Sequence, residues 1–86
     1  MQEKDLELYR IVGKVLRQER LRKDLKFTIF CYENDIATSS LNSIENARAQ
    51  IYFSNIAKVV RALGLSFEEF GALLDKELPK DFFKEL

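Results

Sequence analysis

Small polar side chains are concentrated in one short segment near the middle of the chain. Four hydroxyl and amide residues lie on one face of the helix predicted at about residues 38–46. They are Ser39, Asn42, Ser43 and Asn46. Such groups donate and accept hydrogen bonds and therefore match the edges that base pairs present in the major groove of DNA. Because Leu41 and Ile44 would face the core of the protein, the polar residues form the outer face of this helix. Such a face suits base reading, and it also suits a helix surface that only contacts solvent.

The composition argues against catalysis and metal binding. The chain has no histidine, the commonest general base and metal ligand, and it has one cysteine, Cys31. The three glycines are far apart, so no phosphate-binding glycine loop is present. The neighbouring carboxylates Glu68 and Glu69 are explained by helix capping. We therefore expect no enzymatic activity, no metal and no cofactor.

Length and hydropathy place the chain among small globular domains. It has 86 residues, 47% of them hydrophobic and 33% charged, which suits one compact domain. Its apolar runs are too short to span a membrane, and its first nine residues do not resemble a secretory signal. We expect a cytoplasmic protein without a membrane partner, its one cysteine being a small buried side chain.

The charge is balanced overall but unevenly distributed. The formal net charge is zero, which on its own argues mildly against nucleic-acid binding. Residues 10–26, however, carry seven basic and two acidic side chains, whereas residues 66–86 carry three basic and six acidic ones. A basic first third can hold phosphates, although the same pattern also fits a solvated helix face.

Helical periodicity predicts an all-α fold with five helices and no strand. The expected helices lie at about 4–23, 28–33, 39–47, 53–63 and 67–76. The aromatic and β-branched residues in 27–32 would also suit a strand, but a single strand would have no partner. Asn34 and Asp35 favour a turn, Gly64 favours a helix end, and Ser66 with Glu69 forms a capping box. A short terminal helix is expected after Pro79.

From Gly13 to Phe70 the chain resembles the Cro/repressor-type (XRE) helix-turn-helix family. The resemblance is carried by three blocks, which are Val12–Arg17 with Arg20 and Leu25, Ile36–Asn46, and Ile56–Phe70. It implies a five-helix lambda-repressor-like domain that binds double-stranded DNA and regulates transcription. Small single-domain members of the family include phage repressors, restriction-modification controller proteins and antitoxins. The length and the C-terminal extension favour the first two.

The resemblance also implies individual roles. Thr38, Ser39, Asn42 and Ser43 would contact bases, and Asn46 and Arg48 would contact phosphates. The backbone amides of Phe27 and Thr28 would bind another phosphate, with Lys26 close by. Glu45 would form a structural ion pair with Arg20. Four positions depart from the family pattern, namely Glu19 for an apolar residue, Phe27 for glutamine, and Asp35 and Ala47 for glycines.

The C-terminal apolar residues are compatible with a monomer, a homodimer or a complex with another protein. Residues 1–76 are predicted to form the DNA-binding domain, and 77–86 a helical extension. The apolar set is larger than a small core requires, and it comprises Leu74, Leu78, Phe82, Phe83 and Leu86. These residues would fold back onto their own domain, form a homodimer interface or bind another protein. An antitoxin that binds a toxin through this surface is the alternative to a DNA-binding regulator.

Overall fold

The computed structural model describes residues 3–48 and 51–84, and these two segments form five α-helices and no strand. The helices are α1 (Glu3–Arg22), α2 (Phe27–Glu33), α3 (Thr38–Asn46), α4 (Phe53–Ala62) and α5 (Phe67–Glu77). The all-α class and the five main helices predicted from the sequence are therefore confirmed. The segment that also suited a strand is the helix α2.

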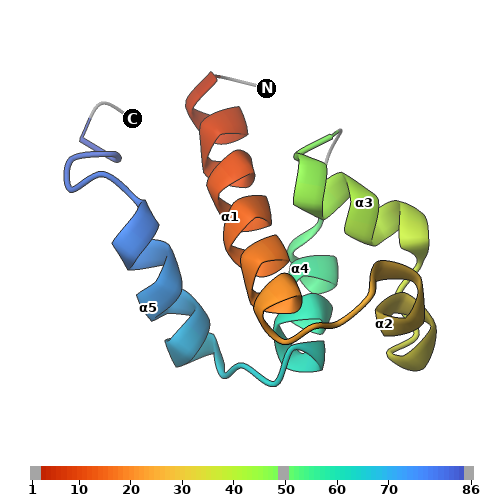
Figure 1. Cartoon of the computed structure of the whole chain (residues 1–86). Helices are drawn as coiled ribbons and strands as arrows, with labels where there is room; N and C mark the ends of the chain where they lie inside the picture. Colours follow the sequence, from red (N-terminus) through yellow and green to blue (C-terminus); the bar gives the residue numbers. More distant parts are fainter. Residues whose placement is uncertain (1–2, 49–50, 85–86) are drawn as a thin grey trace.

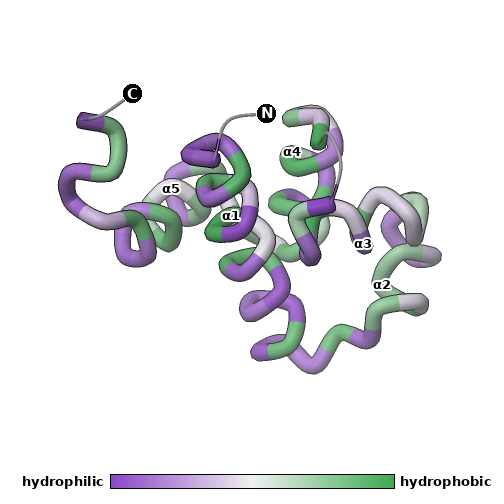
Figure 2. Tube along the Cα trace, turned by 90° about the horizontal axis from the view of Figure 1, so that it is seen from above, coloured by the Kyte–Doolittle hydropathy of each residue, from purple (hydrophilic) through white to green (hydrophobic). Residues whose placement is uncertain are grey.

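The long helix α1 is the centre of the arrangement. It lies between α5 on one side and α3 on the other, and α4 packs against both α3 and α5 (Figure 1). Seen from above, α2 and α3 lie together at one end of the molecule, while α5 and the C-terminal segment lie at the other (Figure 2). The same view shows hydrophobic and hydrophilic residues mixed along α1, as expected of an amphipathic helix.

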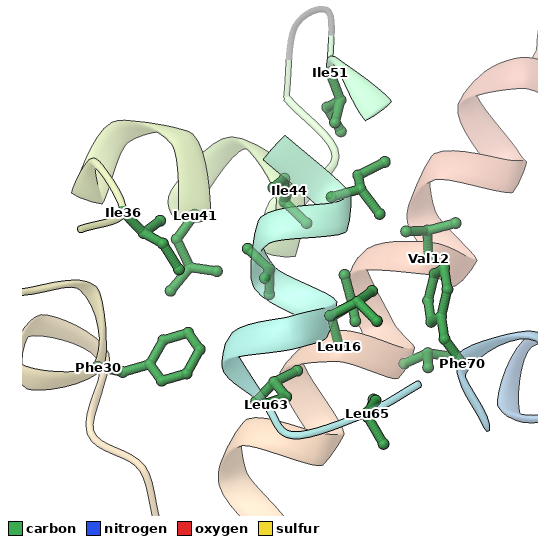
Figure 3. Close-up of a cluster of buried hydrophobic side chains, with 14 of the residues drawn as sticks. Val12, Leu16, Phe30, Ile36, Leu41, Ile44, Ile51, Leu63, Leu65 and Phe70 are labelled. Carbon is green, nitrogen blue, oxygen red and sulfur yellow. The ribbon is translucent and has the colours of Figure 1, made fainter. Parts of the chain in front are cut away.

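The core forms around α4 and receives side chains from all five helices. Leu16 from α1, Leu41 from α3 and Val60 from α4 are completely buried. Phe30 from α2 and Phe70 from α5 close the cluster at its two ends (Figure 3). Because Leu41 and Ile44 are the buried residues of α3, this helix presents its polar residues outward.

Left-handed residues follow the first three helices. Asp24, Asp35 and Ala47 have φ angles of 56°, 54° and 51°, and Gly64 after α4 has a φ of 79°. Aspartate tolerates this conformation better than most residues, whereas alanine has no such advantage. Asp35 and Ala47 are two of the positions where the resemblance leads one to expect glycine. The backbone there has the conformation that glycine favours although the residue is not glycine.

Gly13 lets α1 and α3 approach each other closely. A Cβ atom at this position would overlap the carbonyl oxygen of Ile44 and would lie 3.2 Å from the carbonyl carbon of Glu45. No side chain fits there without a shift of the backbone. A glycine in the interior of a helix weakens the helix, and here the close packing of α3 against α1 explains its presence.

Helix α5 starts with the predicted capping box. The Ser66 hydroxyl accepts a hydrogen bond of 3.0 Å from the Glu69 amide, and the Ser66 amide donates one of 2.8 Å to the Glu69 carboxylate. The hydrogen bonds from the Ser66 backbone and hydroxyl hold the pKa of Glu69 below its usual value. The box therefore satisfies backbone groups that the first turn of a helix otherwise leaves unpaired.

Ser66→Ala is expected to lower the free energy of unfolding by about 1 kcal/mol, because it removes the cap. Urea unfolding followed by circular dichroism measures the change. Ser54→Ala, which removes an exposed hydroxyl from α4, is the control and should change stability by less than about 0.5 kcal/mol. Equal stability of the two variants would contradict a stabilising role for the box.

The segment after α5 forms turns, so the short terminal helix predicted after Pro79 is wrong for the residues described. The Phe82 amide donates to the Pro79 carbonyl and the Lys84 amide to the Asp81 carbonyl, both with the spacing of a tight turn. So short a segment gains too few hydrogen bonds to offset helix nucleation. Phe82 is instead buried, with 2% of its surface exposed, and the Lys4 ammonium lies 4.3 Å from its ring centre.

Candidate nucleic-acid interface

The outer face of α3 carries the residues predicted to read bases. Thr38, Ser39 and Asn42 are exposed, and Ser43 is half-buried. The structure places all four on α3, which packs against α1 at Gly13 and buries Leu41 and Ile44 in the core. The inner side of α3 is therefore firmly packed, and its outer side presents short polar side chains to solvent.

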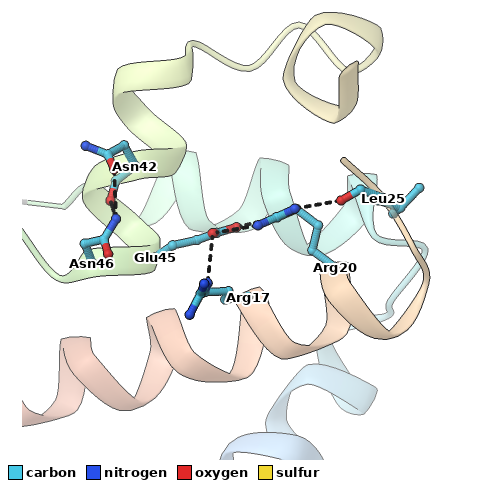
Figure 4. Close-up of polar contacts among 6 residues, drawn as sticks. All are labelled: Arg17, Arg20, Leu25, Asn42, Glu45 and Asn46. Carbon is cyan, nitrogen blue, oxygen red and sulfur yellow. Dashed lines mark hydrogen bonds and ion pairs between the residues drawn. The ribbon is translucent and has the colours of Figure 1, made fainter. Parts of the chain in front are cut away.

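An ion pair between Arg20 and Glu45 fixes α3 to α1. The Arg20 Nε donates to the Glu45 carboxylate at 2.7 Å and Nη2 donates to its other oxygen at 3.1 Å (Figure 4). A third donor, Nη1, reaches the Leu25 carbonyl at 2.6 Å. The Arg20 and Glu45 side chains are only 8% and 5% exposed. The structure thus brings together the two residues expected to pair, in the two-pronged geometry that favours arginine over lysine.

Asn42 and Asn46 are joined on the surface of α3. The Asn46 side-chain amide donates to the Asn42 side-chain oxygen at 2.8 Å and to the Asn42 carbonyl at 3.0 Å (Figure 4). A predicted base-reading residue and a predicted phosphate-binding residue therefore orient each other. The amide of Asn42 remains a donor toward solvent, since its oxygen is the group that accepts from Asn46.

The residues predicted to bind phosphate occupy both ends of this surface. Lys26 and Thr28 are exposed at the start of α2, and Thr28 lines the same groove as Thr38. At the other end, Asn46 and Arg48 are exposed at and just after the last turn of α3. The Phe27 ring is half-buried, with the Arg20 guanidinium 5.4 Å from its centre. This ring packs against the residue that fixes α3, which gives an aromatic side chain a role at the position where the resemblance leads one to expect glutamine.

Glu19, an acidic residue of α1 where the resemblance leads one to expect an apolar one, is buried and paired with Arg22. The Arg22 Nη2 and Nε donate to its two oxygens at 2.8 and 3.1 Å. The hydrogen bond from Arg22 lowers the pKa of Glu19, and this outweighs the opposing effect of burial. The carboxylate is tolerated at this position because its neighbour one turn later neutralises it.

Acid is expected to destabilise the wild type more than a Glu19→Gln variant. A carboxyl whose pKa is lower in the folded protein adds stability above its ordinary value of 4.5, and this contribution is lost as the pH falls through the folded value. Melting temperatures measured by circular dichroism between about pH 6 and about pH 3 test the difference, since only the wild type loses this contribution. Parallel curves for the two proteins would contradict it.

The C-terminal candidates divide into buried and accessible residues. Phe82 was a candidate for a dimer interface, but its burial in its own domain removes it from that role. Leu74, Leu78 and Phe83 line an apolar groove between α1, α4 and α5, and Phe83 is 53% exposed. Leu86 lies outside the described residues.

Two further residues position α3, and neither was predicted from the sequence to do so. One is Gly13, for which a glycine inside a helical pattern was the available signal. The other is Arg17, whose Nε lies 3.9 Å from the Glu45 carboxylate beside the Arg20 pair. Cys31 is buried as expected, and burial raises the pKa of its thiol, so the thiol stays protonated at neutral pH.

Within residues 3–48 and 51–84, no helix is long and apolar enough to cross a membrane. The same residues contain no group of three or more potential metal ligands among histidine, cysteine, aspartate and glutamate. Comparison of the sequence with protein-family models finds no match, and comparison with curated proteins finds none either.

Proposed function

We propose that the chain is a DNA-binding transcriptional regulator of the Cro/repressor-type helix-turn-helix family, acting in the cytoplasm. In this proposal α3 enters the major groove, and Thr38, Ser39, Asn42 and Ser43 contact base edges. The start of α2 and the end of α3 contact phosphates on either side. The phosphate contacts fix the position of the protein along the duplex, and the base contacts supply the sequence preference.

One observation carries the proposal, which is the contrast between the two sides of α3. Its outer side bears hydroxyl and amide groups, while its inner side is fixed by Leu41, Ile44 and the buried Glu45 carboxylate. A helix surface that contacts only solvent would not require its side chains to be held in fixed positions by such packing. Rigid elements hold hydrogen-bonding groups in the geometry that base recognition needs.

Fluorescence anisotropy with duplex DNA tests the proposal. The probes are DNA from upstream of the protein's own gene and a random duplex, each at about 50 and 200 mM salt, where phosphate binding changes steeply. We expect tighter binding to the upstream DNA and loss of this preference in Ser39→Ala/Asn42→Ala, which should keep the wild-type melting temperature. Absence of binding to either duplex at low salt would refute the proposal.

We further propose that the protein binds DNA as a homodimer. Phe53 and Phe83 are 68% and 53% exposed, and both line the apolar groove between α1, α4 and α5. A second copy would cover this groove and place two copies of α3 on one DNA site. Two copies would also double the phosphate contacts of a chain with no net charge.

Sedimentation equilibrium tests the dimer. Phe53→Ser/Phe83→Ser is expected to give a monomer, whereas the control Tyr32→Ser, which removes an aromatic side chain that is 88% exposed on α2, should leave the dimer intact. A wild-type protein that is monomeric and binds no DNA would instead favour the second candidate function. That candidate is an antitoxin-like module that uses the same apolar groove to bind another protein.

A further inference from the structure

A stripe of basic residues runs along α1 outside the proposed reading surface. Arg10, Lys14 and Arg17 follow each other at spacings of four and three residues, so they lie on one face of the helix, and all three are exposed. They line a groove of about 370 Å³ that also contains Asn46 and Ala47 at the end of α3. The stripe therefore starts where the proposed reading surface ends.

The position of this stripe relative to α3 is fixed by contacts already described. The close approach at Gly13 sets the distance between the helices, and Arg17 lies 3.9 Å from the Glu45 carboxylate. A duplex that holds α3 in its major groove would thus contact the stripe at a defined distance from that major groove. By the rise of an α-helix, Arg10 and Arg17 are about 10 Å apart along the axis of α1, so the two side chains can contact different phosphates.

The charges of the stripe are only weakly compensated. Lys14 lies 3.3 Å from the Glu77 carboxylate of α5, and both of these side chains are partly exposed. An exposed pair of this kind contributes little free energy, so a phosphate can replace the carboxylate. Within the described part of the chain, Arg10 has no ion-pair partner.

We infer that Arg10, Lys14 and Arg17 bind the phosphate backbone of DNA next to the site that α3 reads. This inference rests on the proposed function and extends it, because it assigns a second, sequence-independent contact surface on α1. It also explains how a chain without net positive charge can hold a polyanion. The affinity comes from a local concentration of basic groups, because residues 10–26 carry seven basic and only two acidic side chains.

The salt dependence of DNA binding tests the inference. Arg10→Gln/Lys14→Gln removes two charges and leaves the Arg17, Arg20 and Glu45 group intact. Each lost phosphate contact lowers the slope of log affinity against log salt by about 0.9, so the wild type should lose about tenfold more affinity than this variant between about 50 and 200 mM salt. The control Lys76→Gln/Lys80→Gln removes the same charge from α5 and the segment after it, and it should keep the wild-type slope.

The outcomes separate this inference from the proposed function. A reduced slope and an equal loss of affinity for upstream and random DNA would support the stripe, even if the wild type showed no sequence preference. A wild-type slope in Arg10→Gln/Lys14→Gln, or a reduction no larger than in the control, would overturn the stripe while leaving base reading by α3 intact. Failure of the wild type to bind any duplex would overturn both.

Discussion

Replacing Glu45 with alanine is expected to lower the free energy of unfolding by about 3–5 kcal/mol, because it leaves the Arg20 guanidinium buried without its counter-charge. Domains of this size have a total stability of only about 5–15 kcal/mol, so the variant should lose a large part of it. Urea unfolding monitored by circular dichroism measures the loss. It should appear as a lower midpoint with an unchanged slope, as expected when the native contacts alone are weakened.

A double variant distinguishes a buried charge from lost packing. Arg20→Met/Glu45→Met replaces both charges with apolar side chains, which in other proteins is often neutral. We expect it to be more stable than Glu45→Ala but less stable than the wild type, because the Leu25 carbonyl also loses the hydrogen bond from Arg20. If the double variant were as unstable as the single one, an unpaired charge would not be the cause.

Replacing Gly13 with alanine is expected to destabilise the protein by roughly 3 kcal/mol, at the upper end of the usual cost of overpacking. The added Cβ would meet backbone atoms of Ile44 and Glu45, which cannot move aside as a flexible side chain could. Thermal and urea unfolding measure the effect. DNA binding at low temperature should weaken as well, since α3 has to move away from α1.

Gly71 provides the matched control because it also lies inside a helix. A Cβ atom at Gly71 would have no neighbour within 4 Å. Gly71→Ala should therefore stabilise the protein by about 0.5–1 kcal/mol, through the better helix propensity of alanine. Opposite signs for the two substitutions are the expected result. A stabilising Gly13→Ala would show that α1 and α3 do not pack as closely as described.

The helices and their ends could be predicted well because the signals are local. Ser66 and Glu69 are three residues apart, and the structure forms the capping box they predict. Asn34 and Asp35 interrupt the helical pattern, and the chain turns there with Asp35 in the left-handed conformation. Each observed helix begins and ends within one residue of the range expected from periodicity. Such signals depend only on neighbouring residues, so a single sequence contains them.

The packing between helices could not be predicted in the same way. Nothing near Gly13 in the sequence indicates that the Ile44 carbonyl will lie against it, because 31 positions separate the two residues. Ala47 is a poor local signal for a left-handed turn, and only the resemblance pointed to a glycine-like backbone there. The terminal helix predicted after Pro79 is wrong because a local signal was present but tertiary packing overrode it. Its apolar spacing suited a helix, but burial of Phe82 in the domain competes with helix formation.

Because α3 is short, it stays helical only while the whole domain is folded, so the proposed DNA binding depends on the stability of the domain. A nine-residue helix with two buried side chains would be mostly unfolded as a free peptide, because helix nucleation is costly. The proposed reading surface therefore exists only while the domain is folded. By mass action, a duplex present at about a hundred times its dissociation constant should add about 2.7 kcal/mol to the folded state. A thermal shift on adding DNA thus offers a direct readout of ligand binding that needs no labelled probe.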